Sequence, residues 1–135
     1  MKKTIISEET ARAQVDLLFE AFELDTKDTE RLAFVKKFTE YCQRGRLEIS
    51  GSPDAVVVTQ FLKKTVADQS QLTWNWNRLG LGKSRVRVGA EGVLPFSQAF
   101  TVAAPMIGYE VSEIQKMHPV DLSVLEDIST FFRNI

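Results

Sequence analysis

The segment from Leu94 to Phe132 constrains the fold of this chain most, because helix breakers divide it into three short pieces of helical pattern. Pro105 is expected to stop the first piece, since a proline inside a helix lacks an N–H donor and clashes with the preceding turn. Gly108 precedes a short piece near residues 111–117, and Pro119 opens the last. The apolar stripes comprise Phe96, Phe100 and Ala103 in the first piece, and Val124, Leu125, Ile128, Phe131 and Phe132 in the last.

The first 45 residues carry two further apolar stripes at helical spacing. Ser7 is a suitable N-cap for the first helix, and the acidic residues that follow it complement the helix dipole. The second helix is expected to begin at Asp25 or Thr26 and to end at Gly45, a left-handed C-cap. The stripes are Ala11, Val15, Leu18, Phe19 and Phe22, then Leu32, Val35, Phe38 and Cys42. We therefore predict an antiparallel helical hairpin over residues 1–45.

The segment of residues 46–66 gives mixed signals. RLEIS, residues 46–50, alternates in polarity and predicts a short strand or an extended connector. Ser52, Pro53 and Asp54 form a favourable helix start, so the following AVVVTQFLKKTV is predicted to be helical. Its three consecutive valines would suit a strand equally well.

From Leu72 onward the polarity alternates with a period of two. Trp74 and Trp76 share a face with Leu72, and the same alternation returns in RVRV, residues 85–88. The glycine-rich GLGKS lies between them, so we predict a central β-hairpin with one apolar and one polar face. A helical reading of the first arm also fits, since Leu72, Trp76 and Leu79 have helical spacing.

The composition is that of one ordinary globular domain. The chain has 135 residues, of which 44% are apolar and 26% charged, and no apolar run reaches the roughly 18 residues of a membrane span. The N-terminus does not read as a signal peptide, and the single cysteine fits a reducing cytoplasm. We predict a mainly α-helical α+β domain over residues 1–135, divided into 1–45, 46–92 and 93–135.

Charge is unevenly distributed along the chain, although the net charge is only −1. Residues 1–40 carry 7 basic and 9 acidic side chains, residues 41–92 carry 8 and 4, and residues 93–135 carry 2 and 5. Such asymmetry favours self-association or docking on an oppositely charged partner, and random surface variation explains it equally well.

No residue set has the pattern of a catalytic or metal site. GKS at residues 82–84 lacks the upstream glycine and the following helix of a phosphate-binding loop, so a hairpin turn explains it better. His118 is the only histidine and precedes Pro119, where it is expected to cap a helix end. Cys42 lies on an apolar helical face and is expected to be buried. We predict a protein that is not an enzyme and uses no cofactor or metal.

The central hairpin is the best candidate for binding. Its arginines next to tryptophans could hold single-stranded nucleic acid by phosphate contact and stacking. Alternation instead favours tryptophans in the core and arginines in solvent. A third interpretation is a protein interface, since Trp and Arg dominate binding hot spots. Together with the C-terminal aromatic residues, the interface candidates are Trp74, Trp76, Arg85, Arg87, Phe96, Phe100, Phe131 and Phe132.

The last 40 residues resemble the C-terminal half of tail assembly chaperones from long-tailed bacteriophages. The matching features are an alanine-bearing helix, the break at Gly108, a short helix ending at Met117, Asp121 near the start of the last helix, and the terminal pair Phe131 and Phe132. The resemblance covers about residues 94–132.

The resemblance implies a small, non-catalytic cytoplasmic factor made in infected or lysogenic bacteria. Such a factor binds the tape-measure protein, keeps its long apolar helices soluble, helps to recruit tail-tube subunits and often self-associates. The alternative function is a small nucleic-acid-binding or regulatory module that uses the hairpin of residues 74–87.

Overall fold

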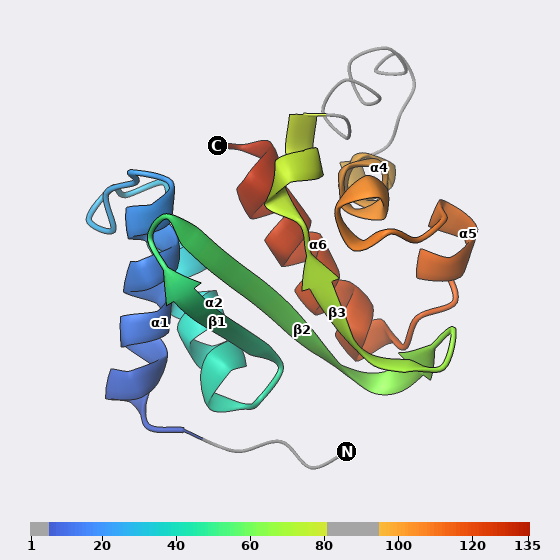
Figure 1. Cartoon of the computed structure of the whole chain (residues 1–135), viewed down its shortest axis with the longest axis horizontal. Coiled ribbons are helices and arrows are strands. Elements are labelled where there is room, and N and C mark those ends of the chain that lie inside the picture. The colour runs from blue at the N-terminus through green and yellow to red at the C-terminus, as the bar shows by residue number, and fades with distance from the viewer. Residues whose placement is uncertain (1–5, 81–94) are drawn as a thin grey trace. The chain divides into compact units, whose positions relative to one another are not determined.

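The computed structural model describes residues 6–80 and 95–135 and has a mixed α+β fold (Figure 1). The chain divides into two compact units, Met1–Phe61 and Leu62–Ile135, which we call the first and second unit. Strand β2 contributes to both. The elements are α1 (Glu8–Ala21), α2 (Leu32–Gln43), β1 (Leu47–Ser52), β2 (Ala55–Val66), β3 (Gln69–Trp74), the 3-10 helix η1 (Trp76–Arg78), α4 (Pro95–Ile107), α5 (Val111–Ile114) and α6 (Pro119–Arg133).

The helical hairpin predicted for the N-terminus is confirmed. Helices α1 and α2 run antiparallel and pack against each other (Figure 1). Ser7 caps α1 by accepting a hydrogen bond from the backbone N–H of Thr10 at 3.1 Å. Gly45 follows the end of α2 with a left-handed φ of 71°, as a C-capping glycine does.

The start predicted for α2 is wrong by several residues, because the helix begins at Leu32. Asp25 and Asp28 instead accept hydrogen bonds from the backbone N–H groups two residues ahead, at 2.8 Å and 3.0 Å. Such local side-chain bonds offer the backbone an alternative to the helix. Leu32 consequently lies at the exposed end of α2 and does not join the buried stripe.

The helix predicted for residues 55–66 is also wrong, since this segment forms strand β2. It pairs antiparallel with β1, in a register that places Ile49 opposite Val58. The proline and aspartate read as a helix start form the turn between the strands instead. Gly51 permits this tight turn, because a Cβ there would lie 2.2 Å from the carbonyl oxygen of Ala55.

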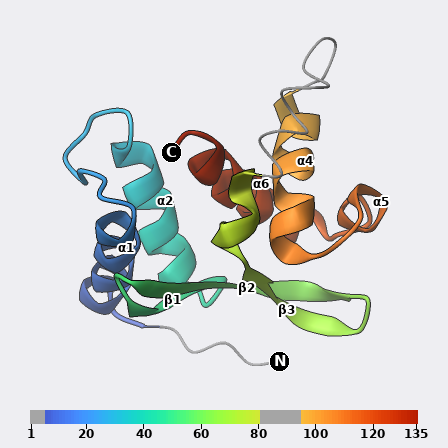
Figure 2. The ribbon, with the colours of Figure 1, turned by 45° about the horizontal axis from the view of Figure 1, so that its top comes forward.

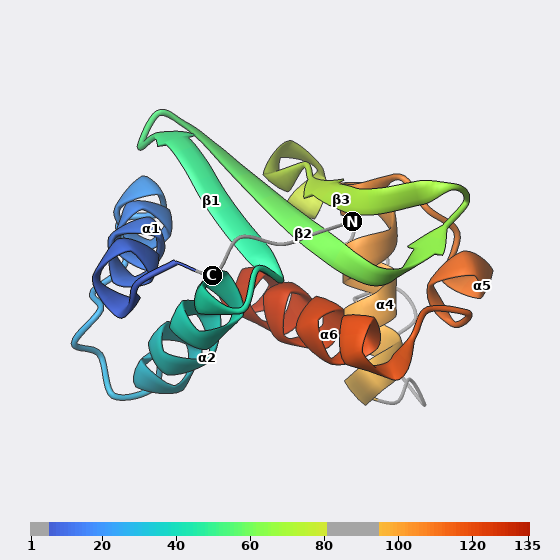
Figure 3. The same ribbon diagram turned by 90° about the horizontal axis from the view of Figure 1, so that it is seen from below.

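The core of the first unit lies between the helical hairpin and one face of β1 and β2. Both helices pack on β1 from the same side, which leaves the opposite face of the strands uncovered by helices of this unit (Figures 2 and 3). The buried apolar residues alternate along β1 and the start of β2, where Thr59 and Gln60 are also buried, and they follow most of the predicted stripes in the helices. They are Ala11, Val15, Leu18, Phe19, Val35, Phe38, Cys42, Leu47, Ile49, Val56 and Val58.

The second unit contains the end of β2, strand β3 and the C-terminal helices. The sheet has the order β1-β2-β3, and β2 and β3 are joined by a turn at Ala67 and Asp68, whose φ angles are 49° and 63°. Helix α4 packs on α6, α5 and β3. Its residues from Val102 to Ile107 are all buried, so it forms the centre of this unit's core.

Three C-terminal helices occur in the predicted order, although α5 ends at Ile114 and not at the predicted Met117. Pro105 does not end α4, however, which continues through it to Ile107. The proline lies in the last turn, and Gly108 with a φ of 78° closes the helix by donating to the carbonyl of Ala104. The helix therefore ends at the glycine and not at the proline.

The central hairpin predicted over residues 72–88 differs from the observed structure. Strand β3 ends at Trp74, and Trp76 lies in η1, which starts where the Asn75 side chain accepts a hydrogen bond from the N–H of Asn77. The partner of β3 is β2. The second predicted arm, residues 85–88, lies outside the described residues. No helix within residues 6–80 and 95–135 has the length and apolar character needed to cross a membrane.

Candidate functional site

Half of the predicted interface residues are core residues. Trp74, Phe100, Phe131 and Phe132 are each at most 5% exposed. The ring of Trp74 stacks on Phe132, with centroids 6.1 Å apart, and Phe131 meets Phe132 edge-on at 5.5 Å. These four side chains therefore stabilise the second unit from within, and the expectation that they present an interface is corrected.

Of the other four interface candidates, one has a described side chain that solvent can reach. Trp76 is half-buried in η1, so it is the one aromatic candidate with a described, accessible side chain. Phe96 lies in α4, whose side chains are described from Ala99 onward. Arg85 and Arg87 lie outside the described residues. Because Trp74 is buried, the structure does not provide the pair of exposed tryptophans that stacking on single-stranded nucleic acid would use.

Cys42 and His118 have the structural roles that the sequence indicates. Burial, and to a lesser extent the negative charge of Glu48, raises the pKa of Cys42 to about 12, so the thiol stays protonated at neutral pH. His118 caps α6, because its Nδ1 accepts a hydrogen bond from the N–H of Val120 at 3.1 Å. In the part of the chain that the structure describes, no three His, Cys, Asp or Glu side chains group as metal ligands.

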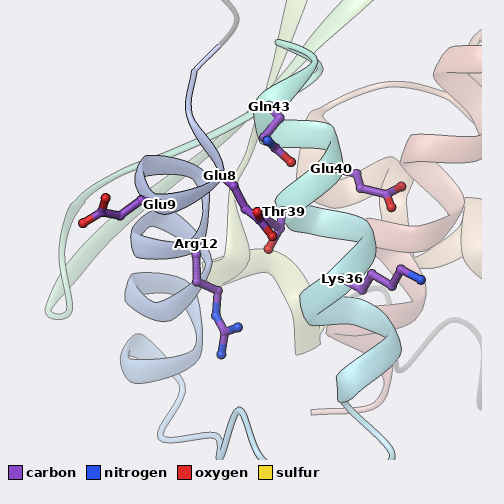
Figure 4. Close-up of a pocket in the computed structure, with 7 residues that line it drawn as sticks. All are labelled: Glu8, Glu9, Arg12, Lys36, Thr39, Glu40 and Gln43. Carbon is purple, nitrogen blue, oxygen red and sulfur yellow. The ribbon is translucent and has the colours of Figure 1, made fainter.

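A polar groove lies between α1 and α2 in the first unit, with a volume of about 620 Å³. Figure 4 shows Glu8 and Arg12 of α1 and Thr39 of α2 in the space between the two helices. Arg12 also pairs with Asp16 at 3.1 Å. We call this the charged groove, and its lining residues are Glu8, Glu9, Arg12, Lys36, Thr39, Glu40 and Gln43.

The charged groove follows the helix axes because its residues have helical spacing. Those on α2 stand at intervals of three and four, which places them on one side of that helix. Thr39 is buried and its hydroxyl donates to the carbonyl of Val35, so it forms part of the floor. Three carboxylates and two cations line the groove, which suits the polar surface of another protein and lacks an enclosed site for chemistry.

A second polar site lies in the second unit, beside the turn between β2 and β3. A cavity of about 260 Å³ is lined there by strand residues and by Glu113 and Lys116 of the α5 segment. Tyr109 spans the same region, with its hydroxyl 3.4 Å from the carbonyl oxygen of Val66. Partial burial and, secondarily, the charge of Glu113 raise the pKa of Tyr109, so its hydroxyl remains a donor.

The backbone beside this cavity is held by Asp121, a residue of α6 that is fully buried. Its two carboxylate oxygens accept hydrogen bonds from the consecutive backbone N–H groups of Lys63 and Lys64, at 2.8 Å and 3.1 Å. Successive N–H groups of a regular strand point to opposite edges. Strand β2 is therefore distorted at this point in the manner of a β-bulge, and both lysine side chains are exposed.

The sequence did not indicate that Asp121 holds the backbone of Lys63 and Lys64. In the sequence, Asp121 stands near a predicted helix start, which is a common position for an acidic residue, and it is one of the features on which the resemblance rests. The signal that could have helped is the pair of adjacent lysines in an otherwise apolar, β-branched segment. No protein family, curated protein or solved structure gives a significant match to the chain.

Proposed function

We propose that the protein is a non-catalytic tail assembly chaperone that binds a tape-measure protein, helps to recruit tail-tube subunits and self-associates. The observation that carries the proposal is the pattern of helix ends in residues 95–133. Helix α4 closes at Gly108, the buried Met117 lies in the chain segment that connects α5 to α6 and not at the end of α5, and Asp121 lies in the first turn of α6. These are the positions on which the resemblance to tail assembly chaperones rests.

The charged groove supports a role in binding protein. A tape-measure protein consists of long helices, and an amphipathic helix carries charged side chains along the side opposite its apolar stripe. The groove between the antiparallel helices α1 and α2 offers charges of both signs from both helices. The C-terminal aromatic residues are buried in the core and are not available to a partner. The proposed partner surface is therefore the polar charged groove.

Co-expression with the tape-measure protein encoded in the same genome tests the proposal. We expect the tape-measure protein to remain soluble and to copurify with this chain. The double variant Lys36→Glu, Glu40→Lys keeps the net charge and an oppositely charged pair at helical spacing, so it should fold normally. It reverses the charge order in the groove and should weaken the complex at least about tenfold.

The matched control is Lys27→Glu, Glu30→Lys, which exchanges two exposed charges outside the groove. It should bind as the unaltered chain does. If the tape-measure protein precipitates equally with and without the chain, the proposed function is wrong. If the complex forms but both exchanges leave it unchanged, the function stands and the charged groove is not its surface.

A further inference from the structure

We propose that Lys63, Lys64 and Lys116 form a docking site for an acidic segment of a partner protein. We call these three residues the lysine site. The proposal concerns the second unit and does not depend on the proposed chaperone function, because its test uses this chain alone with a synthetic peptide. Three observations support it: the distortion of β2, the absence of ion pairs to these lysines within the described residues, and the cavity that Lys64 and Lys116 line.

The first step is the way Asp121 presents two neighbouring lysines. In a regular strand, adjacent side chains point to opposite faces of the sheet. Here Lys63, Lys64 and Thr65 are all exposed, between the buried residues Leu62 and Val66. The distortion held by the buried Asp121 carboxylate coincides with this loss of alternation. The buried carboxylate of Asp121 in α6 thus holds the strand so that the side chains of Lys63 and Lys64 both lie in solvent.

The second step is that these charges are not neutralised within the described structure. None of the three lysines forms an ion pair with residues 6–80 or 95–135. Lys64 and Lys116 line the same cavity, with Glu113 as the only acidic residue among its lining. One oxygen of Glu113 accepts a hydrogen bond from the N–H of Glu110 at 3.1 Å, in the capping box of α5. The site therefore carries a net positive charge.

The third step is the rigidity of the surroundings. The turn at Ala67 and Asp68 has both residues in the left-handed region, as a tight hairpin turn of this kind requires. Tyr109 bonds the end of β2 to the segment between α4 and α5. A site formed by a hairpin and by a segment that is hydrogen-bonded to it is better preorganised than a site on a free loop.

The chemistry favours carboxylates of a protein over phosphates. Phosphate sites typically use backbone N–H groups, and here those of Lys63 and Lys64 are occupied by Asp121. A nucleic-acid strand would need a longer basic track and exposed aromatic rings. Lys64 and Lys116 line the cavity of about 260 Å³, and Lys63 adjoins Lys64 in the strand, which suits a segment with a few acidic side chains.

Titration of the isotope-labelled full chain with an oligoglutamate peptide, followed by amide NMR at low salt, tests the proposal. We expect shifts in the signals of Lys64, Thr65 and Lys116. Loss of one exposed charge pair weakens binding about two- to five-fold. The double variant Lys64→Gln, Lys116→Gln should therefore weaken peptide binding roughly four- to twenty-five-fold.

The control Lys27→Gln, Lys37→Gln removes the same charge from exposed positions of the first unit that lie outside the charged groove, and it should change peptide affinity by less than about twofold. The proposal is overturned if the peptide shifts none of these signals, or if both double variants weaken binding equally. It is also overturned if oligothymidylate binds the site more tightly than the peptide. Concentration-dependent shifts of the same signals without peptide would assign the site to a second copy of the chain.

Discussion

Each unit of the molecule uses a side chain from a helix to satisfy the edge of a strand, but the two side chains differ in charge and burial. In the first unit, Gln14 of α1 accepts a hydrogen bond from the backbone N–H of Ile49 at 2.8 Å. In the second unit, Asp121 of α6 accepts two such bonds from β2. Gln14 is partly exposed, whereas Asp121 is completely buried.

The difference indicates which unit depends more on a single polar residue. Hydrogen bonds to an ionised acceptor are about twice as strong as those to a neutral one. A buried N–H group that loses its acceptor also bears the full cost of desolvation, while water can replace an acceptor near the surface. The second unit should therefore depend strongly on Asp121, and the first unit only weakly on Gln14.

The largest expected effect is that of Asp121→Ala. It removes the fully buried acceptor of two part-buried backbone N–H groups at once and should lower the free energy of unfolding by about 3–5 kcal/mol. Urea denaturation measures the loss, and faster hydrogen exchange at Lys63 and Lys64 should locate it. Asp121→Asn keeps one acceptor oxygen, so its free energy of unfolding should lie between those of the unaltered chain and Asp121→Ala. A loss below about 1 kcal/mol for Asp121→Ala would show that the carboxylate is not what holds this strand.

The next effect concerns the first unit at alkaline pH, through the neutral thiol of Cys42. Its pKa is about 12 in the folded chain, against an ordinary value of 9.0. The stabilisation is complete below pH 9 and is lost as the pH rises from 9 towards 12, because only the unfolded chain ionises there. The free energy of unfolding should fall by about 1.4 kcal/mol between pH 8 and pH 10 for this reason.

The variant Cys42→Ala serves as the control for this pH effect. It keeps every other titrating group, so its stability should decline less steeply, by the amount that the thiol contributes. Denaturant unfolding of both proteins at pH 8 and pH 10 makes the comparison. If the free energy of unfolding falls equally between pH 8 and pH 10 in both proteins, the thiol is not buried as described.

The smallest effect is that of Gln14→Ala, which removes a single bond near the surface. We expect a loss of about 1 kcal/mol in the free energy of unfolding, together with faster exchange of the Ile49 amide proton. Gln14→Glu keeps an acceptor oxygen at the same position and should be close to neutral. If Gln14→Ala costs as much as Asp121→Ala, the contrast between the two units does not hold.

Local signals in the sequence predicted the local features of the fold. The cap at Ser7, the left-handed Gly45, and the helix start at His118 and Pro119 depend on residues next to one another in the chain. The burial of Trp74 likewise follows from alternation, because the period of a strand assigns each residue to a face. These features can be predicted without knowing which elements pack against each other.

Features set by distant residues could not be read in this way. Residues 55–66 contain a favourable helix start, but pairing with β1 and β3 makes them a strand, since tertiary context overrides propensity. The bonds of Gln14 and Asp121 join residues 35 or more positions apart. The lysine site depends on one of these bonds, so no local pattern distinguishes it from an ordinary pair of surface lysines.

The bond between Gln14 and Ile49 also bears on aggregation. A strand at the edge of a sheet exposes a row of unpaired backbone groups, on which a strand of another molecule can add and begin a fibre. The N–H of Ile49 points away from β2, in the middle of β1, and Gln14 already occupies it. Helix α1 thereby blocks the centre of this edge, and β1 is a poor template for growth of an intermolecular sheet.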